Sequence, residues 1–92
     1  MKILVKVKVN LSTIAEFGKK LQAGELDRSL IRGETYCLRS DPAVGYSIWE
    51  AETQNEFESK FNSWRQYYTE VEVNEVISPA EAMKLIIMTD LK

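Results

Sequence analysis

Hydrophobic and polar residues alternate along the first segment of the chain. Residues 2–9 read KILVKVKV, with apolar side chains at Ile3, Val5, Val7 and Val9. A period of two predicts a β-strand with one apolar and one polar face. We expect the apolar face to contact helices and the lysines to lie on the opposite face.

A helix is predicted after this strand. Thr13 and Glu16 have the spacing of a capping box, and Phe17 and Leu21 recur at helical spacing. Gly24 then supplies a helix stop.

A hairpin is predicted in the middle of the chain. Residues 25–32, ELDRSLIR, fit either a helical turn or a loop. Residues 35–39 and 44–51 then have strand composition, and the SDPA segment between them carries turn chemistry at Asp41 and Pro42.

A second helix is predicted to carry an aromatic stripe. Thr53 and Glu56 form another capping box. Aromatic side chains follow at spacings of four, three and four residues: Phe57, Phe61, Trp64 and Tyr68. An aromatic face at helical spacing can line a cofactor site, but it is more often part of a core, and we expect it to lie on the sheet.

The last predicted elements are a strand and a helix. Residues 69–77, TEVEVNEVI, alternate again. Ser78, Pro79 and Glu81 then occupy the N-cap, N1 and N3 positions of a helix. The apolar positions of this helix are Ala82, Met83, Ile86 and Ile87.

The resulting order, βαββαβα, predicts a single α+β domain over residues 1–92. Two β-α-β units joined by a hairpin give the ferredoxin-like arrangement, in which a four-stranded antiparallel sheet carries two helices on one face. The seventh element is an extra C-terminal helix. In this arrangement the first and last strands are neighbours, so Lys6 and Lys8 should lie beside Glu70 and Glu72, each pair contributing roughly 0.2–1 kcal/mol.

The uncovered face of this sheet predicts a homodimer. It combines the lysines and glutamates with Leu4 and Val76, and with one of the two sets of alternate residues in the predicted strand 44–51. That set is either Tyr46, Ile48 and Glu50 or Ser47 and Trp49. Because a partly apolar face of this kind is poorly suited to water, we expect two copies to stack face to face.

Composition supports one small domain and places limits on its chemistry. The chain has 92 residues, 45% of them hydrophobic, with eight basic against four acidic residues up to Arg39 and four basic against ten acidic residues from Ser40 onward. The simplest explanation of this asymmetry is that the two halves lie against each other. The chain has no histidine and a single cysteine, so a metal site would consist of carboxylates.

Cellular location is inferred from the cysteine and from the apolar runs. Cys37 cannot form an internal disulfide, and we expect it to be a small buried hydrophobic residue of a cytoplasmic protein. The aliphatic run Leu85–Met88 is far shorter than the roughly 20 residues of a membrane span. Lysines interrupt the first apolar segment, which excludes a signal-peptide pattern.

The second half of the chain resembles a known family. Residues 44–83, VGYSIWEAETQNEFESKFNSWRQYYTEVEVNEVISPAEAM, are similar to the second half of muconolactone isomerase-like dimeric α+β barrel proteins. The similarity is greatest to short members of unknown function, and the first half matches only in its strand-helix pattern. The resemblance implies a dimer joined through its sheet faces and a cleft between sheet and helices for a small, partly apolar molecule.

Candidate ligand-binding residues follow from this implied cleft: Lys6, Tyr36, Tyr46, Ile48 and Glu50. We expect no cofactor and no clear catalytic residue, since the absence of histidine removes the commonest general base and haem ligand. The alternative is a cofactor-independent isomerase or monooxygenase. In that case Glu50 removes a proton next to a carbonyl while Tyr46 or Lys6 stabilises the enolate. We favour a salt-bridged or solvated role for the Glu50 carboxylate.

Two other classes of function find little support in the sequence. An RNA-binding sheet would need aromatic residues at the centre of its first and third strands within a basic surround, and the acidic last strand opposes a phosphate backbone. A metal site at Glu70, Glu72 and Glu75 fails because Glu75 lies on the opposite face of its strand.

Overall fold

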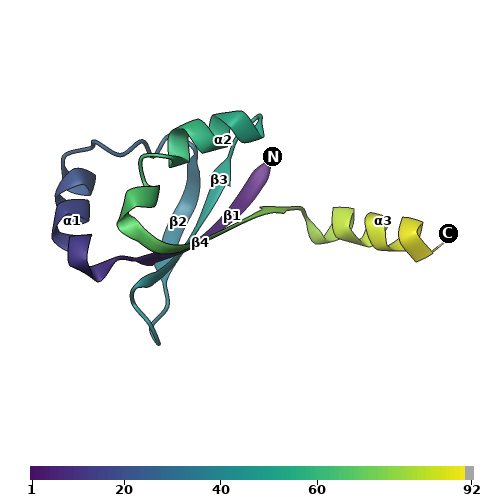
Figure 1. Ribbon diagram of the computed structural model, residues 1–92. Coiled ribbons are helices and arrows are strands. Elements are labelled where there is room, and N and C mark those ends of the chain that lie inside the picture. The colour runs from purple at the N-terminus through teal and green to yellow at the C-terminus, as the bar shows by residue number, and fades with distance from the viewer. Residues whose placement is uncertain (91–92) are drawn as a thin grey trace.

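The computed structural model describes residues 1–90 and contains four strands, three α-helices and two short 3-10 helices (Figure 1). The strands are β1 (Lys2–Val9), β2 (Ile31–Cys37), β3 (Val44–Glu50) and β4 (Tyr68–Val76). The α-helices are α1 (Ile14–Gln22), α2 (Gln54–Phe61) and α3 (Pro79–Asp90). The 3-10 helices are η1 (Leu11–Thr13) and η2 (Arg65–Tyr67).

The sheet has the predicted ferredoxin-like topology. Its strand order is β2-β3-β1-β4, and every neighbouring pair is antiparallel. The first strand is therefore central and the last lies beside it, which confirms the α+β fold class derived from the sequence.

Helices α1 and α2 cover one face of this sheet and bury an aromatic core beneath them. Ile3 and Val5 of β1 are almost completely buried. The Trp49 ring of β3 makes edge-to-face contacts with Phe57 and Phe61 of α2, with ring centroids 5.5 and 5.3 Å apart. Such pairs contribute roughly 0.5–1.5 kcal/mol each beyond their burial.

One of the two predicted capping boxes forms. At α2, the Glu56 amide donates to Thr53 Oγ1 at 3.1 Å, while the Glu56 carboxylate accepts from the Glu52 amide at 2.9 Å. At α1 the prediction was wrong, because the short helix η1 precedes α1 and has its own N-cap residue. There Asn10 Oδ1 accepts from the Ser12 amide at 3.0 Å, and Thr13 makes no side-chain cap.

The aromatic stripe is a core, as predicted, but the helix under it is shorter than expected. Phe57, Phe61 and Trp64 are buried, whereas α2 ends at Phe61 and Tyr68 is the first residue of β4. The chain turns through η2 between them, which buries Tyr67 instead.

The edge strand β2 begins four residues before its predicted start and contains a bulge. Residues 25–30 form the loop that precedes it, which settles the ambiguity of this segment. Ile31 and Arg32 pair with Trp49 and Ile48, whereas the register has shifted by the time Tyr36 pairs with Tyr46. Residues 33–35 therefore lie opposite one residue of β3, and Gly33 adopts φ +69° in this bulge, a conformation that glycine adopts at little cost.

Cys37 was expected to be buried, and this expectation was wrong. It is the last residue of β2 and is exposed. Its strand forms the edge of the sheet and is exposed from Arg32 to Cys37, so burial does not extend to its side chain.

The lysines of β1 lie beside the glutamates of β4, as predicted. Lys6 is opposite Glu72 and Lys8 is opposite Glu70. The cross-strand neighbours do not form close ion pairs, however. Lys8 pairs instead with Asp41 at 3.5 Å, and none of the ion pairs within residues 1–90 includes Lys6.

The register also shows which alternate residues of β3 lie on the sheet face without helices, which we call the open face. Lys6 is opposite Tyr46, Leu4 is opposite Ile48, and Lys2 is opposite Glu50. Because directly paired residues point to the same side of a sheet, Tyr46, Ile48 and Glu50 lie on the open face.

Helix α3 begins as predicted but extends away from the domain. The Glu81 amide donates to the Ser78 hydroxyl at 3.1 Å, and Pro79 is the first helical residue. Figure 1 shows α3 continuing from the end of β4 as an arm that points away from α1, α2 and the sheet, and the molecule is accordingly elongated, with extents of 52 × 30 × 20 Å.

Candidate functional site

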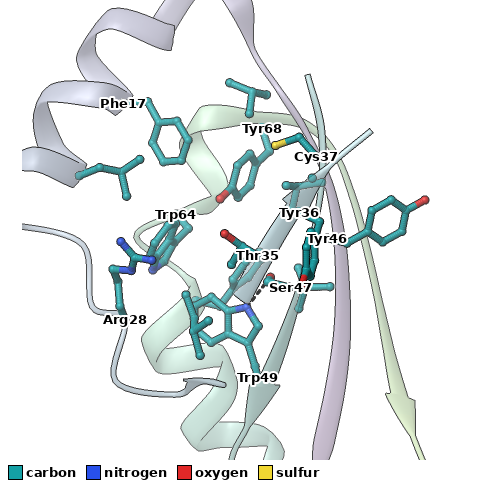
Figure 2. A pocket seen from close by; sticks show the side chains of 17 residues that line it. Phe17, Arg28, Thr35, Tyr36, Cys37, Tyr46, Ser47, Trp49, Trp64 and Tyr68 are labelled. Atoms are coloured by element: carbon teal, nitrogen blue, oxygen red, sulfur yellow. Dashed lines mark hydrogen bonds between the residues drawn. The ribbon is translucent and has the colours of Figure 1, made fainter. Parts of the chain in front are cut away.

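A cleft of about 260 Å³ lies between the sheet and the helical layer. Its lining comes from β1, β2, β3, α1, the loop before β2, and the segment from α2 to β4. Figure 2 shows Phe17, Trp64 and Tyr68 on one side of this cleft, with Thr35, Cys37 and Ser47 on the side of the sheet.

Aromatic rings form the wall on the helical side. Phe17 contacts Tyr68 and Trp64 edge-to-face, with ring centroids 5.7 and 6.1 Å apart. Phe17 also stacks on the buried ring of Tyr67, at 5.0 Å. Because each ring contacts other rings as well as the cleft, the wall is held in place before any ligand binds.

One end of the cleft is formed by Trp49 and Ser47. Trp49 is 1% exposed, and its indole N–H donates to Ser47 Oγ at 2.9 Å. The hydrogen bond fixes the indole orientation and leaves the Ser47 hydroxyl hydrogen free to donate to another acceptor.

Tyr68 brings a polar group into this apolar wall. Burial raises the pKa of the Tyr68 hydroxyl above its ordinary value of 10.0, and no hydrogen bond contributes to the shift. The hydroxyl is therefore neutral at physiological pH and is available as a hydrogen-bond donor to a molecule in the cleft.

Exposed residues of β2 form part of the cleft wall. Cys37 is paired with Gly45, and both line the cleft together with Thr35. The bulge at Gly33 separates this part of β2 from the regular pairing at Ile31 and Arg32. Bulges of this kind are common beside functional sites, where they redirect side chains.

The predicted ligand-binding residues lie on the open face of the sheet. Tyr36 and Tyr46 border the cleft, but they pair with each other and their side chains lie on the open face; Figure 2 shows the Tyr46 ring pointing away from the cleft. The Tyr36 side chain is 64% exposed, and its hydroxyl donates to the Glu34 carboxylate at 2.8 Å. Lys6 and Ile48 also lie on the open face and do not line the cleft.

Glu50, the candidate base, also lies away from the cleft. It is exposed at the end of β3 and pairs with Arg32, with Glu50 Oε2 and Arg32 Nε 3.5 Å apart. On sequence grounds we favoured a salt-bridged or solvated role for Glu50, and the structure shows this exposed ion pair.

Several cleft residues were not selected from the sequence: Phe17, Arg28, Thr35, Ser47, Trp64 and Tyr68. The strand parity was a usable signal for Ser47, since alternation places it opposite to Tyr46. Arg28 and Thr35 depend on the course of a loop and on a bulge, for which the sequence carries no periodic signal.

Two kinds of site were also sought within residues 1–90. In this part of the chain, no group of three or more His, Cys, Asp or Glu side chains is placed to hold a metal ion. No helix in the same range has the length and apolar character that crossing a membrane requires.

Comparison with known proteins shows the fold. No protein-family model and no curated protein sequence matches the chain. Among solved structures, the chain is similar to 5-chloro-2-hydroxyhydroquinone dehydrochlorinase from Burkholderia phenoliruptrix AC1100, in complex with 2,5-dihydroxybenzoquinone, with 18% identity, a TM-score of 0.54, and coverage of 88% of this chain and 98% of that chain. An antibiotic biosynthesis monooxygenase matches with 10% identity, a TM-score of 0.48, and coverage of 84% of this chain and 98% of that one.

Proposed function

We propose that this protein binds a small, partly apolar molecule in the cleft between the sheet and helices α1 and α2. The observation that carries this proposal is the open cleft of about 260 Å³ beside a buried aromatic core. An engineered apolar cavity of roughly 150 Å³ takes up benzene, so the cleft has room for a single ring with substituents.

The chemistry of the lining supports the same size and type of ligand. Phe17, Trp64 and Tyr68 provide aromatic surface, and the hydroxyls of Tyr68, Thr35 and Ser47 provide a few polar groups. Largely apolar walls with few polar groups are typical of small-molecule sites. The dehydrochlorinase of similar fold holds a single-ring quinone, which is consistent with this size.

We also propose that the protein is a cytoplasmic homodimer joined through the open face. Leu4, Ile48 and Val76 place apolar side chains on this face among the lysines of β1 and the glutamates of β4. Two copies related by a two-fold axis can set the lysines of one against the glutamates of the other, which favours a second copy as partner.

A ligand screen with a blocked cleft tests the binding function. A Cβ at Gly45 would make ordinary contacts of 3.7 Å with Cys37 Sγ, Tyr36 O and Val7 Cγ2. The fold should therefore tolerate Gly45→Ala, whereas Gly45→Leu should fill part of the cleft. We expect small ring compounds to raise the melting temperature of the wild type and of Gly45→Ala, because a ligand of the folded state stabilises it.

Gly45→Leu should remain folded and lose this shift. A ligand that stabilises Gly45→Leu as strongly as the wild type would place binding elsewhere. Light scattering tests the dimer, which should have twice the 10.6 kDa mass of one chain.

A further inference from the structure

Arg28 places a cationic group at the edge of the cleft. It lines the cleft, its side chain is exposed, and none of the ion pairs within residues 1–90 includes it. Its position beside Trp64 is visible in Figure 2. The guanidinium is thus available to an anion that enters with the ligand.

The loop that carries Arg28 is fixed by the preceding residue. Asp27 accepts hydrogen bonds from Lys60 Nζ and from the Ser29 amide, both at 2.8 Å. The Trp64 indole N–H donates to the Asp27 backbone oxygen at 3.1 Å. These contacts join the loop to α2 and to the cleft wall, and they engage the Asp27 carboxylate with Lys60 rather than with Arg28.

We propose that the cleft ligand is a ring compound with an anionic group, such as a carboxylate, that binds the Arg28 guanidinium. The ring would lie among Phe17, Trp64 and Tyr68. This inference rests on the proposed function of the cleft and adds a charge requirement to it. Guanidinium groups match carboxylates with two parallel hydrogen bonds, and at this exposed position we expect a gain in affinity of about tenfold.

The test compares benzoate with benzyl alcohol, a neutral ring of similar size. Trp49 and Trp64 line the cleft, so their fluorescence reports binding of either compound. Arg28→Gln removes the cation, and Arg39→Gln is a matched control at an exposed residue that does not line the cleft. We expect the wild type and Arg39→Gln to bind benzoate about tenfold more tightly than benzyl alcohol, and Arg28→Gln to lose this preference.

The outcomes separate the two proposals. Equal binding of both rings by the wild type, or unchanged benzoate affinity in Arg28→Gln, overturns the role of Arg28 and leaves the cleft as a site for neutral rings. Absence of binding by either ring counts against both proposals.

A second inference comes independently from α3, which exposes much of its apolar surface. Its five largest apolar side chains are each 50–62% exposed: Met83, Leu85, Ile86, Ile87 and Met88. An isolated helix of 12 residues is only marginally stable in water, since most helices depend on tertiary contacts. A helix this apolar needs a covering surface.

The area that a dimer would bury favours a second copy as the partner. The sheet has four strands with a flat footprint on the order of 450 Å² at standard strand spacing. A stable dimer needs about 800 Å² on each partner. One side of α3 adds on the order of 300 Å², which brings the interface close to that size.

We propose that α3 of each chain extends over the second copy and lies against the rim of the stacked sheets. Two residues separate the start of the helix from Val76, whose partner on the open face is Lys2. The proposed sheet interface and α3 are therefore continuous in the chain. Exchange of the two arms around a two-fold axis closes the dimer and covers both helices.

Substitutions in the full-length chain test this exchange. Ile86→Glu places a charge on the apolar surface of α3, and Lys84→Glu introduces the same charge at a polar position of the same helix. We expect sedimentation to show a dimer for the wild type and Lys84→Glu and a monomer of 10.6 kDa for Ile86→Glu. An unchanged near-ultraviolet spectrum of Trp49 and Trp64 would show that the domain remains folded.

A dimer that persists in Ile86→Glu overturns the exchange of α3 and leaves the sheet-face dimer standing. A monomeric wild type overturns both.

Discussion

Replacing Phe57 with alanine tests the aromatic core that supports the cleft. The Phe57 side chain is 0% exposed and does not line the cleft. Its ring makes an edge-to-face contact with Trp49 at 5.5 Å and stacks on Phe61 at 5.2 Å. Because Phe57 is fully buried and does not itself line the cleft, the substitution should leave an apolar void within the core.

The expected cost is a large fraction of the total stability. Phe→Ala substitutions in cores lower the free energy of unfolding by about 3–5 kcal/mol. A domain of this length has a total of roughly 5–14 kcal/mol. With a urea dependence of about 1.5 kcal/mol/M, the unfolding midpoint should fall by about 2–3 M at a fixed protein concentration.

Urea unfolding followed by tryptophan fluorescence measures this change. Phe61→Ala is the matched comparison, because Phe61 is 1% exposed but lines the cleft. Its removal enlarges an existing opening, so its cost should fall near the lower end of the same range. A loss of less than about 1 kcal/mol in Phe57→Ala, far below the range for buried aromatic residues, would refute the closed core.

Three further predictions follow from single sites. Gly18 lies within α1, and nothing within 4 Å would meet a Cβ there. Gly18→Ala should therefore raise the free energy of unfolding, measured by urea titration, by up to about 1 kcal/mol. A loss of stability would indicate a contact that the single chain does not show. The hydrogen bond from Lys60 lowers the pKa of Asp27 below its ordinary value of 3.8, so this stabilisation is complete above pH 3.8 and is lost as pH falls towards the folded-state pKa. The decrease in the urea midpoint from pH 5 to pH 3 should therefore be smaller in Asp27→Asn than in the wild type. Equal decreases in the two proteins would contradict a role for the ion pair. Cys37 is exposed and lines the cleft, so a thiol reagent should label it in the native protein, and a cleft ligand should slow the labelling. Labelling only after unfolding would contradict its position.

The fold was predictable because periodic patterns carry it. Alternation in β1 and β4, and the Ser78–Pro79 start of α3, gave the element order and the adjacency of the first and last strands. Where the prediction failed, a different local structure had formed. Asn10 caps η1 in place of Thr13 at α1, and η2 ends the helical spacing before Tyr68.

The cleft was less predictable because its position depends on the sheet register and on a loop. The sequence did not show which alternate residues of β3 face the cleft, and the side chains of the candidates Tyr46, Ile48 and Glu50 all lie on the face away from it. Arg28 follows Asp27, whose carboxylate accepts a hydrogen bond from Lys60 and whose backbone oxygen accepts one from the Trp64 indole. Contacts between residues more than 30 positions apart leave no periodic trace in a sequence.

The side chains of β3 that serve the two proposed functions lie on opposite faces of the sheet. Ser47 and Trp49 line the cleft, whereas Ile48 between them lies opposite Leu4 on the open face. Alternate residues of a strand point to opposite faces, so ligand binding and sheet-face association use different side chains of the same seven-residue strand. In the proposed dimer, α3 is the element that reaches from one copy to the other and would connect the two functions. Ligand affinity that stays constant while dilution dissociates the dimer would show that each cleft is complete within its own chain. Affinity that falls with dissociation would make the partner's α3 part of the site.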